Sequence, residues 1–349
     1  MKLNKSVIQS LKFLAFLAVG ILLLWLAFRN VNFRSLWDGL EKANYFWVIF
    51  SLLFALLAYL SRARRWMILI HPLGYHPLFK NTFYALMSGY LANLALPRIG
   101  EVTRCVVLGK KEKIPVDKLF GTVVIERTID FLTLLLITFA LIFASGKLIR
   151  QFLNDSILKP FQEKVLSPFG MTWIFWIILA AMGIIALAVM IKYKKSLREI
   201  RLFAKIFDIA RGILDGFKTI ISLDRKWEFI FHTIFIWLNY ALMTWFVVFS
   251  LRSTSDISFW SSIFILVIGG LAMSAPVQSG LGVFHYTVSR GLAVVHGIKL
   301  EDGLVYALLA HESQLIFVLI LGIFSFFALY GFHHHKDDGP GLLSKKEMP

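Results

Sequence analysis

The chain has 349 residues, of which 58% are hydrophobic, 15% aromatic and only 17% charged, a composition typical of a polytopic membrane protein rather than a soluble one. Its net charge of +16 would suggest nucleic acid as the partner of a soluble protein, but here we expect the excess in cytoplasmic loops against anionic lipid and no nucleic-acid partner. The single cysteine, Cys105, excludes an internal disulfide framework.

The N-terminus carries three lysines before its first apolar run, which resembles a signal sequence. No small-x-small cleavage site precedes Arg29, so we interpret the run as an uncleaved first span. Seven further apolar segments follow along the chain. The eight segments lie at 13–28, 46–61, 82–108, 120–144, 173–191, 229–249, 259–295 and 304–330.

Two of these segments contain proline and glycine, which remove a backbone hydrogen bond or loosen a helical turn. The breaks are Pro97 and Gly100 in 82–108, and Pro276, Gly280 and Gly282 in 259–295. After the first break the apolar run continues for only ~15 Å, about half of a ~30 Å hydrocarbon core. This length predicts the returning arm of a re-entrant hairpin; two unrelated kinks are the alternative.

The distribution of lysine and arginine decides between two topologies. If all eight segments cross the membrane, the outer loops carry most of the positive charge; if the two broken segments return to the side they entered from, the inner loops carry it. We therefore predict an all-α polytopic membrane protein with six full transmembrane helices, two re-entrant helical hairpins and both termini inside. The order of elements in 1–144 then recurs inverted in 173–330, as in transporters that hold substrate near the midplane.

The connecting regions are more polar. We predict an external loop at 145–172 and a polar cytoplasmic tail at 331–349, where a solvated tail is favoured over metal binding by the three histidines at 333–335. In the cytoplasmic loop 192–228, basic residues surround apolar ones at helical spacing. This pattern predicts an amphipathic helix, either gathering lipid on the inner leaflet or packing under the bundle.

Charged residues inside the apolar segments are the strongest functional signal, because each costs roughly 2.5–3.5 kcal/mol at the centre of a lipid-facing helix. They are Arg98, Glu101, Arg104, Glu126, Arg127, Asp130, Arg290 and Glu312. Arginine occurs here and lysine does not, which suits bidentate pairing with carboxylate or phosphate. The spacings predict ion pairs Glu101–Arg104 and Arg127–Asp130.

Two interpretations of these charges stay open. The pairs could simply lock the first hairpin to segment 120–144, or one arginine, Arg98 or Arg104, could be left to hold an anionic headgroup beside unpaired backbone donors at the break. Arg62, Arg64 and Arg65 end the second span and are interpreted as positive-inside anchors, with the alternative that one of them reaches the site.

The second break supplies Gln278, Gly280, Gly282 and His285 as further candidate substrate-binding residues, together with Arg290. Its glycines would allow either a ligand or a neighbouring helix to approach closely. His311 and Glu312 could carry a proton or form a plain hydrogen-bonded pair. We find no phosphate-cradling glycine loop and no zinc spacing, and expect no cofactor and no metal.

Several of these motifs occur together in one known family. PRIGEVTR and GTVVIERTIDF, preceded by RARRW and followed by PVQSGLGVFH, resemble the lysylphosphatidylglycerol synthase transmembrane-region family over about residues 10–330. The resemblance implies a stand-alone member without the aminoacyltransferase domain: a flippase-like protein of the bacterial inner (plasma) membrane that moves aminoacyl-phosphatidylglycerol. By motif position, the family's first signature carries over to a set of eight residues. They are Pro97, Arg98, Gly100, Glu101, Arg104, Glu126, Arg127 and Asp130.

At the family's second signature, this chain differs from many members. Many members have a glycine pair and a later glutamate where this chain has Ser279 and His285, so another anionic or polyprenyl-linked lipid is an alternative substrate. The function we favour is a lipid translocase whose partner is a membrane phospholipid. The alternatives are a subunit that recruits a separate cytoplasmic synthase through 192–228, and a headgroup transferase with Glu101, Asp130 or His285 as base. Homo-oligomerisation stays open.

Overall fold

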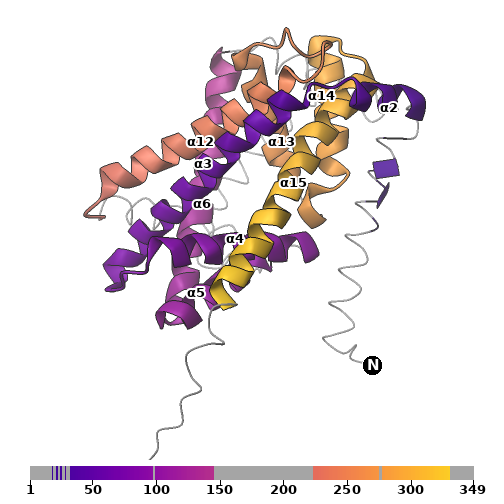
Figure 1. The fold of residues 1–349 in the computed structure, drawn as a ribbon. Helices are drawn as coiled ribbons and strands as arrows, with labels where there is room; N and C mark the ends of the chain where they lie inside the picture. Colours follow the sequence, from indigo (N-terminus) through magenta and orange to yellow (C-terminus); the bar gives the residue numbers. More distant parts are fainter. Residues whose placement is uncertain are drawn as a thin grey trace, which may run out of the picture.

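The computed structural model describes residues 32–96, 99–144, 223–274 and 277–330, together with isolated positions between 18 and 28. In this part of the chain there are helices and no strand, which confirms the all-α class (Figure 1). The elements are α2 (Phe33–Glu41), α3 (Tyr45–Ile70), η1 (His71–Leu73), α4 (Phe79–Ala95), α5 (Gly100–Glu112), α6 (Val116–Ala144), α12 (Lys226–Val248), α13 (Phe259–Met273), η5 (Gln278–Gly280), α14 (Val283–His296) and α15 (Leu300–Tyr330).

Among the described residues, four helical stretches are long and apolar enough to cross a bilayer. They are Tyr45–Leu73, Val116–Ala144, Lys226–Val248 and Leu300–Leu329. At ~1.5 Å per residue the longer ones reach ~44 Å, which exceeds a ~30 Å hydrocarbon core. Large aromatic side chains stay exposed on them, for example Phe143 at 87% and Phe327 at 63%. Such surfaces are costly in water and suited to lipid, so the chain is a multi-pass membrane protein.

The predicted spans 120–144, 229–249 and 304–330 correspond to α6, α12 and α15. Other predicted regions lie outside the described residues. These are most of 13–28, the loop 145–172, the span 173–191, the first 31 positions of 192–228, and the tail 331–349.

The second predicted span, 46–61, is too short. The helix α3 continues through Arg62 and Arg65 to Ile70, and most of this extension is buried. Sequence reasoning ended the span at these arginines because unpaired charges belong at a membrane surface. Inside the protein they are paired, so the helix need not end there.

The first predicted break is confirmed: α4 ends at Ala95 and α5 starts at Gly100. The amide of Gly100 donates to Asn93 Oδ1 over 2.7 Å, which satisfies one of the donors that a helix N-terminus leaves free. Gly100 is needed here because a Cβ at this position would collide with the backbone oxygen of Gly89 and with the Asn93 side chain. The two helices can therefore cross closely. Pro97 itself lies outside the described residues.

The second predicted break is also confirmed. Between α13 and α14 the chain forms only the short η5, in which Ser279 and Gly280 have φ of 49° and 69°, followed by Gly282 with φ of 78°. These left-handed conformations favour glycine and cannot continue an α-helix. The break is thus built into the backbone, and α14 starts afresh at Val283.

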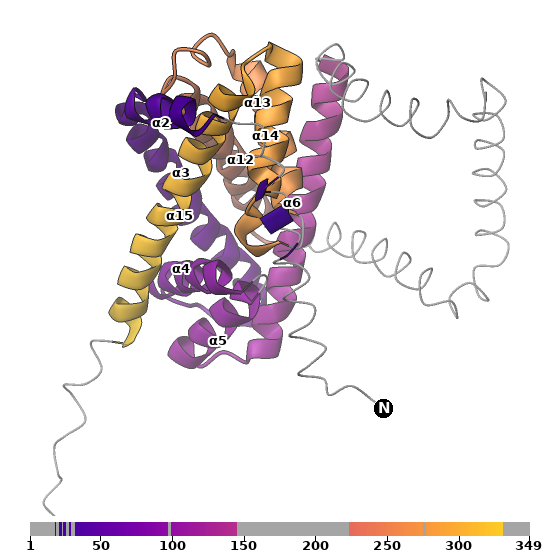
Figure 2. The same ribbon diagram turned by 90° about the vertical axis from the view of Figure 1, so that its right-hand side faces the viewer.

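The two broken segments occupy different levels of the bundle. In both views α4 and α5 lie toward one end, and α13 and α14 toward the other (Figures 1 and 2). Figure 2 shows α6 running along one side of the bundle and α15 slanting along the opposite side. The helix α12 packs along α3, α4 against α5 and α15, and α14 against α15. This packing turns the charged sides of α3, α5 and α6 toward one another.

Candidate functional site

Two arginines of α3 meet one carboxylate of α6 inside the bundle. Arg62 and Arg65 are three residues apart and project from one side of α3. Nη2 of Arg65 lies 2.6 Å from Oδ1 of Asp130, and Nη2 of Arg62 donates to Oδ2 of the same residue. The Arg65 side chain is fully buried. Asp130 alone therefore offsets half of the positive charge on these two arginines.

Glu126, one turn before Asp130 on α6, joins α3 to α5. Its side chain is fully buried, and its Oε2 accepts a hydrogen bond of 3.0 Å from Nη1 of Arg104. Its Oε1 lies 3.3 Å from Nη2 of Arg62 and 3.5 Å from Nη2 of Arg65. This one carboxylate thus faces three guanidinium groups, which hold α3, α5 and α6 together.

Arg104 was one of two residues expected to be left free for a headgroup, and its surroundings argue against that role. Its side chain is 2% exposed, pairs with Glu126, and lies 4.7 Å above the Trp66 ring in a cation–π contact. Trp66 is held in turn by a hydrogen bond of 2.8 Å from its indole N–H to Thr122 Oγ1. The predicted pair between Glu101 and Arg104 is wrong, because both residues pair with α6 instead.

The outer edge of the site is formed by Arg127 and Glu101. Nε of Arg127 lies 3.6 Å from Oε1 of Glu101, and its Nη1 lies 3.9 Å from Oδ2 of Asp130, which confirms the predicted Arg127–Asp130 pair. The Arg127 side chain is 39% exposed. On the surface of α6 it lies between Val124 and Phe131, which are 51% and 49% exposed. The site therefore opens onto an apolar surface.

We call this set of charges the arginine cluster. Its members are Arg62, Arg65, Arg104, Arg127, Glu101, Glu126 and Asp130. Four guanidinium groups face three carboxylates, so one positive charge is uncompensated within the described part of the chain. Several buried nitrogens also lack a hydrogen-bond acceptor there. They are Nε of Arg62, Arg65, Arg104 and Arg127, and Nη2 of Arg104. Two carboxylate oxygens, Oε2 of Glu101 and Oε1 of Glu126, also lack a hydrogen bond there, so the cluster combines a net positive charge with unsatisfied donors and acceptors.

Neutral hydroxyls complete the inner wall of the cluster. Nη1 of Arg62 donates to the phenol oxygens of Tyr90 on α4 and Tyr240 on α12, over 3.0 and 3.2 Å. Nη1 of Arg65 donates to Thr233 Oγ1 over 3.3 Å. These contacts fix the direction of both guanidinium groups without adding negative charge.

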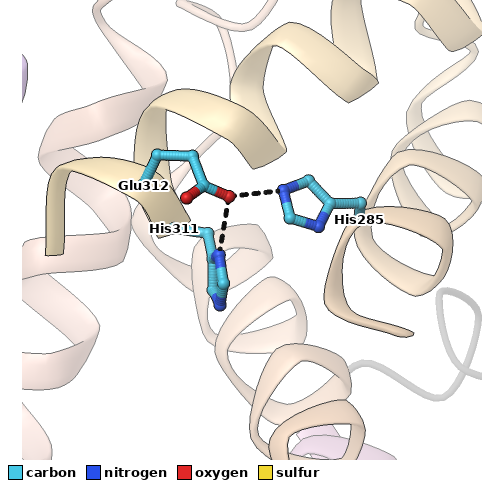
Figure 3. Close-up of side chains that lie close together, drawn as sticks. All are labelled: His285, His311 and Glu312. Atoms are coloured by element: carbon cyan, nitrogen blue, oxygen red, sulfur yellow. Dashed lines mark hydrogen bonds and ion pairs between the residues drawn. The ribbon is translucent and has the colours of Figure 1, made fainter. Parts of the chain in front are cut away.

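A second group of polar side chains lies at the other break. Oε1 of Glu312 lies 3.1 Å from Nε2 of His285 and 3.0 Å from Nδ1 of His311, so one carboxylate oxygen faces both rings (Figure 3). We call His285, His311 and Glu312 the histidine–glutamate triad. His285 comes from α14 and the other two from α15. The sequence had placed His311 and Glu312 together but left His285 in the other candidate group.

The two breaks touch each other. The backbone oxygen of Asn93, whose side chain binds the start of α5, also lies 3.5 Å from Ser279 Oγ in η5. The backbone oxygen of Ser279 in turn lies 2.8 Å from Nε2 of His311. An apolar cavity of about 310 Å³ adjoins this contact and is lined by Leu94, Ser279, Leu281, Leu315, Ile316 and Leu319. The breaks thus meet beside the triad.

Not every predicted site residue joins these groups. Arg290 is exposed on α14, with its guanidinium 5.7 Å from the centre of the Tyr286 ring, and belongs to neither group. Gly280 and Gly282 shape the backbone of the second break. Arg98 lies outside the described residues, as does the side chain of Gln278.

The sequence analysis did not predict that two arginines of α3 belong to the site. It treated them as surface anchors, with the alternative that one reaches the site, whereas both Arg62 and Arg65 do so. Arg64 is the surface residue of the three, paired with Glu228 across the partly exposed side of α12 over 2.9 Å. A signal was present in the spacings. Arg62 and Arg65 are three residues apart and Glu126 and Asp130 are four apart, so each pair lies on one face of its helix and the two pairs can meet.

Comparison with known proteins gives one family and one relative. The sequence model of the family described as "Lysylphosphatidylglycerol synthase TM region" matches residues 13–322. Over 94 residues the chain is 35% identical to UPF0104 membrane protein MJ1595 of Methanocaldococcus jannaschii, covering 26% of this chain. The match spans 28% of the length of that relative. No solved structure matches the chain.

Proposed function

We propose that this chain, which belongs to the lysylphosphatidylglycerol synthase transmembrane-region family, moves a phospholipid with an anionic or modified headgroup across the bilayer. The arginine cluster would receive the phosphate of the headgroup, and the acyl chains would stay in the surrounding lipid. Aminoacyl-phosphatidylglycerol is one phospholipid with such a headgroup and would be a candidate substrate.

The observation that carries the proposal is the uncompensated charge of the arginine cluster. Guanidinium groups suit phosphate because they donate two parallel hydrogen bonds in a fixed geometry. Nitrogens of four arginines have no acceptor within the described residues, and a buried donor without a partner costs about 1–3 kcal/mol. A phosphate oxygen at this place would satisfy such donors and offset the remaining charge.

The surface around Arg127 favours a lipid over a soluble anion. Arg127 is the cluster arginine with the most exposed side chain. Its neighbours along α6, Val124 and Phe131, are apolar and half exposed. A phosphate bound by Arg127 would therefore have hydrocarbon beside it, as the phosphate of a lipid does.

The proposal includes the predicted topology of six spans and two re-entrant hairpins in an inverted repeat, in a bacterial inner membrane with both termini cytoplasmic. Two findings support it. The segment pairs α4–α5 and α13–α14 lie toward opposite ends of the bundle (Figure 2). Their breaks meet at Asn93 and Ser279. Two hairpins that enter from opposite faces and meet near the midplane would have this arrangement.

The experiment is lipid movement in proteoliposomes, measured with acyl-labelled phosphatidylglycerol whose outer-leaflet fluorescence is quenched chemically. Wild-type protein should make the inner-leaflet pool accessible. Arg127→Ala should abolish this movement, and Arg127→Lys should restore part of it, because lysine keeps the charge but not the bidentate geometry. The control is Arg252→Ala, which removes an exposed arginine from the turn before α13 and should leave movement unchanged.

Arg127 is a better test than Arg104. Removing Arg104 would leave the buried Glu126 without its hydrogen bond, so loss of activity could reflect loss of folding. Normal lipid movement by Arg127→Ala, or no movement by wild-type protein with anionic, zwitterionic or lysyl-modified phospholipid, would overturn the proposal.

A further inference from the structure

We propose that the histidine–glutamate triad binds a divalent transition-metal ion, with zinc as the best fit. The ligands would be Nε2 of His285, Nδ1 of His311 and a carboxylate oxygen of Glu312. All three ligand atoms lie within 4.8 Å of one another. The inference uses only these residues and is independent of lipid transport.

The position of one proton carries the argument. Nε2 of His311 lies 2.8 Å from the backbone oxygen of Ser279. A carbonyl oxygen only accepts, so this nitrogen must carry the hydrogen. In the neutral ring Nδ1 then has a lone pair and no hydrogen to donate. It nevertheless faces Oε1 of Glu312, also an acceptor, at 3.0 Å. Two acceptors at this distance repel each other unless a cation lies between them.

The hydrogen bond to Ser279 is also the outer-shell contact that metal-bound histidines make. Such a histidine donates its other ring N–H to a carbonyl or a carboxylate, which fixes both the tautomer and the ring orientation. The Phe284 ring stacks on the face of the His311 ring, with the two ring centroids 5.0 Å apart. His311 is thus oriented before any metal arrives.

Two of the three distances in the triad are close to those of a tetrahedral ion, and the third, between the two ring nitrogens, lies within 4.8 Å and would shorten on binding. Bonds of about 2.0–2.1 Å place neighbouring ligand atoms of a tetrahedron about 3.3 Å apart. The two nitrogen–oxygen distances of the triad, 3.1 and 3.0 Å, need to widen only slightly. His285 is fully buried, its Nε2 faces Glu312 Oε1, and its Nδ1 has no hydrogen-bond partner in the described residues, so Nε2 is directed at the proposed metal position.

The ligand set selects the kind of metal. Two imidazoles and one carboxylate suit zinc and its transition-metal neighbours, whereas calcium and magnesium prefer oxygen ligands alone. Three protein ligands leave the fourth position of a tetrahedral ion for water or another oxygen. Glu312 is 40% exposed and supplies the accessible side of the site. A metal here would tie α14 to α15 beside the second break.

The test is direct metal binding to the purified full chain in which His333, His334 and His335 are changed to alanine, so that the tail cannot bind. After chelation, cobalt is titrated and its visible absorption recorded, and zinc is then added to displace it. We expect one tetrahedral cobalt per chain, displaced by one zinc. His285→Ala and Glu312→Gln should each weaken binding by about 100-fold, at least as much as loss of an outer-shell partner does.

The matched control is His296→Gln, which changes a histidine at the other end of α14 and should bind as the parent does. Size-exclusion profiles establish that each variant is folded; if His285→Ala is not, the parent protein and Glu312→Gln decide alone. Three results would overturn the proposal: no stoichiometric cobalt in the parent, full binding by Glu312→Gln, or equal loss in His296→Gln. The first would leave a proton as the cation of the triad.

Discussion

The ion pair between Arg104 and Glu126 gives the sharpest prediction on stability. We consider Arg104→Met, which keeps much of the apolar stem over Trp66 but removes the charge. Glu126 then stays fully buried with no partner for its Oε2, and with Arg62 and Arg65 only at 3.3 and 3.5 Å from its Oε1. Arg62 and Arg65 still offset its charge, so the cost is that of one buried acceptor left unsatisfied, about 1–3 kcal/mol.

The matched control is Arg64→Met on α3, which also removes the arginine of one ion pair between helices. The Arg64–Glu228 pair is shorter, at 2.9 Å, but its side chains are 35% and 29% exposed. Solvent screens such a pair, and its loss should cost about 0–1 kcal/mol. The comparison therefore separates burial from distance as the cause of stability.

The assay is thermal unfolding in detergent, followed by intrinsic tryptophan fluorescence. With about 2 °C of Tm per kcal/mol for a chain of this size, we expect Arg104→Met to lower Tm by about 2–6 °C and Arg64→Met by about 2 °C or less. Equal shifts for the two variants would refute the reasoning, because they would mean that burial of Glu126 does not decide the strength of the pair.

Two further predictions concern the first break. Gly100→Ala should lower stability by about 1–3 kcal/mol, because its Cβ would meet the Gly89 oxygen and the Asn93 side chain; Gly121→Ala, with open space around its Cβ, should be neutral or raise Tm, and the same thermal assay checks both. Asn93→Ala should cost about 1 kcal/mol by freeing the Gly100 amide, and faster hydrogen exchange at the start of α5 than in wild-type protein would report it. Unchanged exchange there would contradict the second prediction.

The sequence predicted the elements whose cause is local. The second break follows from glycines with positive φ such as Gly280 and Gly282, and the pair Arg127–Asp130 follows from helical spacing. The sequence did not predict ion pairs between residues that lie far apart along the chain. The partners of Arg62 and Arg65 on α6 are more than sixty residues away in sequence, so local reasoning assigned these arginines to a membrane surface.

The same limit applied to the second break. His285 and Glu312 belong to different helices, and only the crossing of α14 and α15 turns them toward each other (Figure 3). The hydrogen bond from His311 to the Ser279 carbonyl involves a backbone atom in a left-handed turn, which no spacing rule identifies. A metal was not expected from the sequence for this reason.

The partly exposed side chain of Arg127 determines which lipid concentration would control binding. Val124 and Phe131 flank it, so a lipid would arrive sideways through neighbouring acyl chains rather than from the aqueous phase. Occupancy would then depend on mole fraction in the plane of the membrane. Diluting the vesicles in buffer would leave it unchanged, while mixing inert lipid into each vesicle would lower it.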